Sequence, residues 1–199
     1  MEITIVDKKK RLSKTLLGHF KENIRVACTL LEAKGFGFLC DEQRIRIEKG
    51  PYTKKPSVIA MFVRKSGDMV FFLPDLRTKK GKKTAKRRFK SSRAIRTFVH
   101  EMGHKLEWQY PHLLNKKERT KLYERGKKRK VEGLLVSSYG KTSPKEMMAE
   151  SFAHWIAPEL FTVKKKSPRV DVGTAATLLG QYVVLLQEEL PPSPGYWKR

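Results

Sequence analysis

The sequence predicts an α+β fold, and three observations lead to that prediction. Residues 12–34 repeat apolar side chains at helical spacing, which is typical of a helix with one buried face. Residues 36–73 contain four short segments rich in β-branched and aromatic residues, with turn-forming residues nearby. Two further helices are predicted, one over 91–109 from apolar residues at helical spacing and one over 144–157 from the start signal Ser143-Pro144. Together these patterns indicate a small, mostly antiparallel sheet packed on several helices.

The first part of the chain is predicted to supply one helix and the sheet. A strand at about 2–6 precedes the helix at 12–34, and Gly35 ends that helix. The inner face of the helix comprises Leu16, Leu17, Phe20, Ile24, Ala27, Cys28 and Leu31. The four short β segments cover 36–39, 44–47, 58–63 and 69–73, with a turn at Ser66-Gly67-Asp68.

The rest of the chain is predicted to be mainly helical. Residues 77–90 have no apolar periodicity and are expected to form a basic loop. Ser91 or Ser92 is the expected N-cap of the helix that runs to about Gln109, and Ser143 is that of the helix at 144–157. A last helix is expected over 173–190. The expected organisation is a single domain over 1–190, made of a helix and sheet (1–76), a basic loop (77–90) and a helical half (91–190), with a tail at 191–199.

The net charge of +24 is concentrated in the middle of the chain. Residues 77–130 carry 21 basic and 4 acidic side chains, whereas the segments before and after them have balances of only +6 and +1. Three interpretations remain open: a solvated segment, a surface for nucleic acid or another polyanion through 77–96 and 116–130, and steering of an acidic protein substrate. Aromatic residues are sparse in these runs, so contacts to a nucleic-acid backbone are favoured over base stacking.

The composition also bears on the compartment. No signal peptide or membrane-spanning segment is predicted, so we expect no membrane association and a cytoplasmic or virion-packaged protein, with non-classical export left open. Cys28 and Cys40 do not form a disulfide framework, and we interpret both as reduced thiols.

The segment His100-Glu101-Met102-Gly103-His104 is the strongest chemical signal in the sequence. On a helix the two histidines lie one turn apart on the same face, so both imidazoles can reach one zinc ion. Glu101 would then lie near a water bound to that ion. This is the residue pattern of a zinc hydrolase that activates water at neutral pH.

A catalytic zinc ion needs a third protein ligand, which must come from elsewhere in the chain. Glu146, Glu150 and His154 repeat every four residues and therefore share one face of the predicted helix at 144–157. We interpret this face as directed at the metal, with a solvated acidic face as the alternative. The downstream candidates for the third ligand are Glu132, Glu146, Glu150, His154 and Asp171.

A family resemblance narrows this choice. Ser138-Tyr139-Gly140-Lys141-Thr142 and the following Glu146-Met147-Met148-Ala149-Glu150-Ser151-Phe152, taken with the HExxH segment, resemble the catalytic domain of anthrax lethal factor and the Pro-Pro endopeptidases, which are gluzincin metallopeptidases. In that pattern a tyrosine precedes the zinc-ligand glutamate by seven residues, and a second glutamate follows it by four. The resemblance covers 100–104 and 137–153.

The resemblance implies a zincin-like fold, one zinc ion and a role for each site residue. His100, His104 and Glu146 would be the zinc ligands, and Glu101 would be the general base and proton donor. Tyr139 would hydrogen-bond the oxyanion. Glu150 would lie behind the ligands and accept a proton from a ligand histidine.

The sequence therefore predicts a zinc-dependent metalloendopeptidase with a protein or peptide substrate. The substrate strand is expected along the sheet edge, at residues 69–73. Two alternatives remain: a basic nucleic-acid-associated structural protein of a phage or mobile element with a vestigial metal site, and a zinc hydrolase that acts on a non-peptide amide.

Overall fold

The computed structural model of the chain describes residues 3–50, 58–111, 139–140 and 142–160, and the single positions 117, 120, 121, 123 and 124. The chain divides into two compact units, Met1–Lys105 and Leu106–Arg199. Among the described residues, no helix combines the length and the apolar character needed to cross a lipid bilayer.

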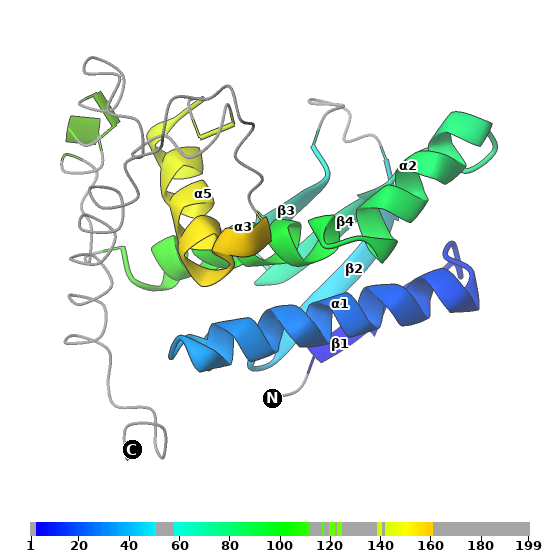
Figure 1. Cartoon of the computed structure of the whole chain (residues 1–199), viewed down its shortest axis with the longest axis horizontal. Coiled ribbons are helices and arrows are strands. Elements are labelled where there is room, and N and C mark those ends of the chain that lie inside the picture. The colour runs from blue at the N-terminus through cyan, green and yellow to red at the C-terminus, as the bar shows by residue number, and fades with distance from the viewer. Residues whose placement is uncertain are drawn as a thin grey trace. The chain divides into compact units, whose positions relative to one another are not determined.

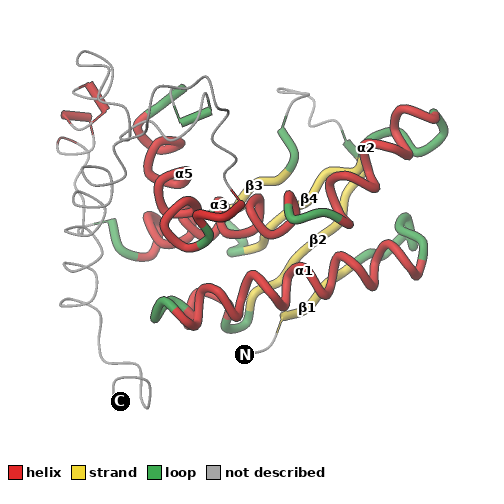
Figure 2. The backbone as a smooth tube through the Cα atoms, viewed as in Figure 1, coloured by secondary structure: helices red, strands yellow, loops and turns green. Residues whose placement is uncertain are grey.

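A four-stranded mixed sheet forms the centre of the first unit. Its strands are β1 (Ile3–Val6), β2 (Gln43–Lys49), β3 (Ala60–Val63) and β4 (Asp68–Leu73), in the spatial order β1-β2-β4-β3. β1 pairs with β2 in parallel, β2 pairs with β4 in parallel, and β3 pairs with β4 antiparallel. Figure 2 shows the sheet behind the helices of this unit.

The helix α1 (Lys14–Ala33) connects β1 to β2 and covers one face of the sheet (Figure 1). Ser13 caps it by accepting a hydrogen bond from the Leu16 amide, and its buried residues are Phe20, Ile24, Ala27, Cys28 and Leu31. The Phe20 ring packs edge-on against Phe71 of β4, with 4.9 Å between ring centroids. A short 3₁₀ turn, η1 (Gly37–Cys40), then leads into β2.

The helix α2 (Lys79–Lys90) follows β4 and packs on α1. Thr78 caps its first turn, and Asn23 of α1 donates its side-chain amide to the Phe89 carbonyl at 2.9 Å. The Phe89 ring packs edge-on against Phe20, with 5.0 Å between centroids. Arg88 donates to the carbonyl of Phe72 at 3.1 Å, which also ties α2 to the sheet.

Two further helices carry the predicted site residues. α3 (Arg93–Gln109) begins in the first unit and continues past Lys105 into the second. α5 (Pro144–Ile156) lies in the second unit and is followed by the short turn η2 (Pro158–Leu160). Within that unit, Lys145 of α5 lies 4.0 Å from the Glu107 carboxylate of α3.

Several predicted elements are confirmed. The α+β composition and the helices at 12–34, 91–109 and 144–157 are present, as are the strands at 2–6, 44–47, 58–63 and 69–73. Ser143 caps α5 by accepting from the Glu146 amide, and Pro144 follows it. Cys28 and Cys40 are free and buried. The helix at 173–190 and the tail at 191–199 lie outside the described residues.

Three predictions about the fold were wrong. The sheet is mixed rather than mostly antiparallel, because α1 carries the chain across the sheet to start β2 parallel to β1, and β4 enters between β2 and β3. Residues 77–90 are not a loop, because α2 covers all but the first two of them (Figure 2). Residues 36–39 are not a strand, because Gly37–Cys40 form the 3₁₀ turn η1 and Phe36 directly precedes it.

Candidate metal centre

The HExxH residues lie on α3, which also carries apolar residues of the core. Ala94, Phe98, Val99 and Met102 are fully buried on this helix and fix its orientation on the core. His100 and Glu101 are also buried, each with 6% of its surface exposed, while His104 is half-buried. The two imidazole rings lie nearly perpendicular, with 5.0 Å between centroids. One turn of helix therefore brings both imidazoles to the same side.

Glu146 and Glu150 lie one turn apart on α5. Glu146 is half-buried in the first turn, where the Ser143 cap holds its amide. Glu150 is 4% exposed and sits among the buried residues Met147, Phe152 and Ala153. Buried carboxylates require hydrogen-bond or ionic partners, which is consistent with a role beyond surface solvation.

His100, His104 and Glu146 form a cluster that could hold a metal ion. Each residue offers one ligand atom, an imidazole nitrogen or a carboxylate oxygen, and these atoms all lie within 4.8 Å of one another. Two imidazoles and one carboxylate are a donor set that suits zinc and leaves a coordination position for water. Three of the predicted site residues are thus brought together.

Glu101 makes a contact that the sequence did not predict. Its Oε2 accepts a hydrogen bond of 2.8 Å from the backbone amide of Phe62 on β3. Among the described strands, β3 has a neighbour on one side only, so an amide on its other side needs a partner from outside the sheet. The carboxylate of Glu101 satisfies this amide and is oriented by it.

Lys105, next to His104, is a second feature that was not predicted. It is 7% exposed, and its ammonium donates to the Leu39 carbonyl at 2.7 Å and to Oε1 of Gln43 at 3.1 Å. Burial lowers the pKa of Lys105 from its ordinary value, and the nearby Cys40 opposes this shift. These bonds anchor α3 to η1 and to the start of β2.

The other predicted site residues are not members of the cluster formed by His100, His104 and Glu146. Tyr139 lies in the turn before α5 and is 47% exposed, and its carbonyl accepts from the amide and hydroxyl of Thr142. His154 is half-buried near the end of α5. The catalytic roles of Glu101 and Tyr139, and the role of Glu150 behind the ligands, stay predictions. Glu132 and Asp171 lie outside the described residues.

The prediction that a substrate strand would lie along a sheet edge at residues 69–73 was wrong, because this segment is not at an edge. That segment is β4, which has β2 on one side and β3 on the other, so its backbone is already paired. In the sheet formed by the described strands, β1 and β3 are the edge strands, and β3 is the one that contacts Glu101.

Comparison of the chain with models of protein families, with curated proteins and with solved structures finds no match.

Proposed function

We propose that this protein is a zinc-dependent metalloendopeptidase with a zincin-like catalytic core. The observation that carries the proposal is the convergence of His100, His104 and Glu146, whose ligand atoms lie within 4.8 Å of one another. The histidines are close in the sequence, but Glu146 is 42 residues beyond His104. The family resemblance implied Glu146 as the third ligand, and the cluster contains this residue. These are two separate lines of support.

The other residues have proposed roles that follow from their chemistry. A zinc ion, when bound, lowers the pKa of a coordinated water to about 7. Glu101 takes a proton from the attacking water and returns it to the leaving amine, so that the new C–O bond replaces the C–N bond. Tyr139 donates a hydrogen bond to the carbonyl oxygen as negative charge develops there, a contribution of about 2–4 kcal/mol.

The contact between Glu101 and Phe62 supports this assignment of roles. A general base must be held in one orientation, and a backbone amide on a sheet edge is a rigid donor. We propose that a peptide substrate lies along the same strand, β3, where other edge groups can pair with an extended chain.

Metal analysis with a peptide-cleavage assay tests the proposal. Purified protein should contain about one zinc ion per chain, and His100→Ala should lose it. Glu101→Gln should keep the zinc but lose cleavage of a random peptide pool, because only the proton acceptor is removed. Zinc in the wild type without peptide cleavage would instead support hydrolysis of a non-peptide amide. Absence of both zinc and cleavage would support a nucleic-acid-associated structural protein with a vestigial site.

A further inference from the structure

We propose that the exposed side of α2 binds the phosphate backbone of a nucleic acid, without regard to base sequence. This surface, called the basic face below, consists of the exposed residues of α2. All of them are basic: Lys79, Lys80, Lys82, Lys83, Lys86, Arg87 and Lys90. The proposal concerns a surface separate from the metal cluster and does not depend on the proposed peptidase activity.

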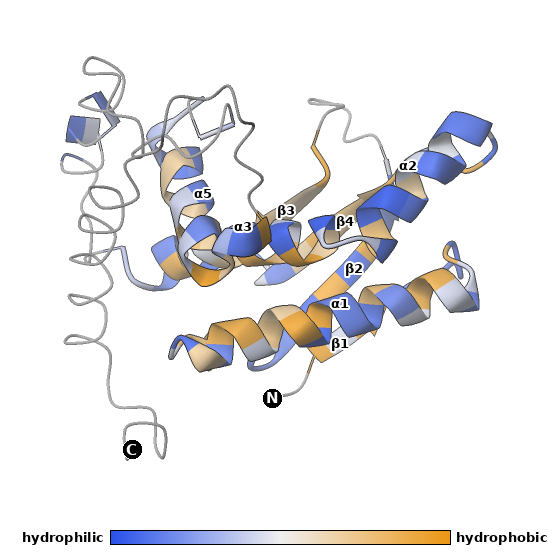
Figure 3. Ribbon diagram, viewed as in Figure 1, coloured by the Kyte–Doolittle hydropathy of each residue, from blue (hydrophilic) through white to orange (hydrophobic). Residues whose placement is uncertain are grey.

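The apolar residues of α2 lie on its buried side, and every residue on its exposed side is charged. Gly81, Ala85 and Phe89 are buried against the rest of the unit, and Thr84 and Arg88 are half-buried. Figure 3 shows α2 as a predominantly hydrophilic ribbon. Because residues 79–90 form a helix rather than a loop, the cations are held on a fixed surface instead of being spread over many conformations.

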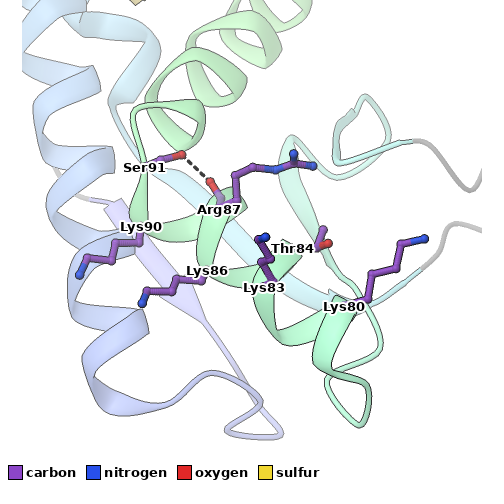
Figure 4. Close-up of a pocket in the computed structure, with 7 residues that line it drawn as sticks. All are labelled: Lys80, Lys83, Thr84, Lys86, Arg87, Lys90 and Ser91. Atoms are coloured by element: carbon purple, nitrogen blue, oxygen red, sulfur yellow. Dashed lines mark hydrogen bonds between the residues drawn. The ribbon is translucent and has the colours of Figure 1, made fainter.

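The basic face borders an open hollow of about 710 Å³ (Figure 4). Every side chain that lines it can donate hydrogen bonds: five are Lys or Arg, and the other two are the hydroxyls of Thr84 and Ser91. Lysine, arginine and hydroxyl side chains are the groups that most often contact phosphate oxygens in protein–DNA complexes. The Ser91 hydroxyl also bonds the Arg87 carbonyl, which steadies the end of the helix.

The charges of the basic face are not neutralised within the part of the chain that the structure describes. The ion pairs found there involve residues of other elements. The positive charges also affect the neighbouring Arg93. Burial, together with the charges of Arg87 and Arg96, lowers the pKa of Arg93. Within the described residues, this surface therefore concentrates positive charge that no acidic side chain pairs with.

Folding explains only the end of this arrangement, where Arg87 and Lys90 lie in the last turn and interact favourably with the helix dipole. Lys79, Lys82 and Lys83 are cations in the first turns of the helix, where the helix dipole disfavours them. Lys79–Lys83, Lys82–Lys86, Lys83–Arg87 and Lys86–Lys90 are like-charged pairs four residues apart, which also destabilise a helix. A surface selected for solubility alone would mix both signs of charge. An external polyanion would relieve both costs.

A nucleic acid fits this surface better than an acidic protein does. Protein interfaces depend on a core of aromatic or aliphatic anchors, and no exposed residue of α2 is of either type. A phosphate backbone needs only closely spaced cations. The helix is about 18 Å long, which matches about five phosphates of one DNA strand. The absence of exposed aromatic residues on α2 also argues against readout by base stacking.

Salt-dependent binding of the full chain to a fluorescent DNA duplex of random sequence tests the proposal. The wild type should bind with an affinity that falls steeply between about 50 and about 200 mM salt. The triple variant Lys83→Gln, Lys86→Gln and Lys90→Gln should bind roughly tenfold or more weakly, with the slope of log K against log salt reduced by about 3. Replacement of the same three lysines by arginine should preserve the affinity.

A matched control separates the basic face from overall charge. Lys34→Gln, Arg44→Gln and Lys65→Gln remove the same number of charges from exposed positions outside α2 and should change the affinity by less than about twofold. Equal losses in both triple variants would overturn the proposal, because affinity would then follow net charge alone. Binding of an acidic polypeptide as tightly as the duplex would overturn the choice of partner. Circular dichroism of each variant verifies that α2 remains folded.

Discussion

The backbone amide of Phe62 donates a 2.8 Å hydrogen bond to the carboxylate of Glu101, which ties the edge strand β3 to the helix that carries both histidines. Both residues are buried, at 8% and 6% exposure. Glu101 therefore has a structural task as well as its proposed catalytic one. Substitutions that differ only in their ability to accept this hydrogen bond can separate the two.

Glu101→Ala should lower the free energy of unfolding by about 1–3 kcal/mol, because it leaves a buried amide without a partner. Glu101→Gln keeps an acceptor oxygen and should lower it by less than about 1 kcal/mol. Both variants should lose peptide cleavage by at least about a hundredfold. Urea unfolding and a cleavage assay measure the two effects. Equal destabilisation by both variants would show that the Phe62 bond contributes nothing to stability.

Glu146 and Glu150 should differ in their effect on metal affinity. Glu146→Gln removes a ligand and should weaken zinc binding by more than about a hundredfold. Glu150→Gln should weaken it by about 10- to 100-fold, which is typical when a residue behind the ligands is changed. Competition with a chelator measures both.

Glu159→Gln serves as the control for these two variants. Glu159 is an exposed acid of η2 in the same unit, so its replacement removes the same charge and should leave zinc affinity unchanged. If Glu150→Gln behaved like this control, Glu150 would have no part in the metal centre.

The sequence predicted the elements of the fold better than their arrangement. Helical periodicity identified α1 and α3, and the start signal Ser143-Pro144 identified α5. It missed α2, whose inner face consists of only Gly81, Ala85 and Phe89, too small a set to register as periodic. The parallel pairing of β2 with β4 was also missed, since strand order depends on contacts that no local pattern encodes.

The residues of the candidate site were also predicted only in part. The family resemblance, and not spacing alone, selected Glu146 from five candidates for the third ligand, and the cluster that could hold a metal ion includes it. Lys105 carried a signal that was overlooked: it lies seven residues after Phe98 and three after Met102, on the inner face of α3. A cation at a core position requires polar partners, here Leu39 and Gln43. The Phe62 amide had no signal, because every residue except proline has such a group.

Gly81→Ala should destabilise the protein, whereas Gly18→Ala should stabilise it. A Cβ atom at Gly81 would lie 1.7 Å from the Asp75 carbonyl oxygen, so the start of α2 would have to move, at a cost of about 2 kcal/mol or more. Gly18 is exposed within α1, and a Cβ atom there would have no other group within 4 Å, so alanine should gain about 0.5–1 kcal/mol. Thermal unfolding compares the two. Stabilisation by Gly81→Ala would contradict the close packing of α2 on Asp75.

Cys40 should make stability fall as the pH rises above its ordinary thiol pKa of 9.0. A hydrogen bond with Cys28 and burial raise the pKa of Cys40 far above that value in the folded protein. Above pH 9.0 the unfolded chain loses this proton while the folded chain keeps it, so ionisation favours unfolding. The full contribution of the thiol is present below that pH, and its loss amounts to at most about 1.4 kcal/mol per pH unit above it.

Urea unfolding of the wild type and of Cys40→Ala from about pH 8 to about pH 10, under reducing conditions, measures this contribution. The variant should be less stable at pH 8, because it leaves a small cavity in the core, but its stability should fall less steeply with pH. Lysine and tyrosine side chains also titrate in this range, yet they are common to both proteins and cancel in the difference. If the free energies of unfolding of the two proteins changed in parallel with pH, the Cys40 thiol would ionise as readily in the folded chain as in the unfolded one. The burial of Cys40 in η1 argues against that outcome, because burial disfavours the thiolate.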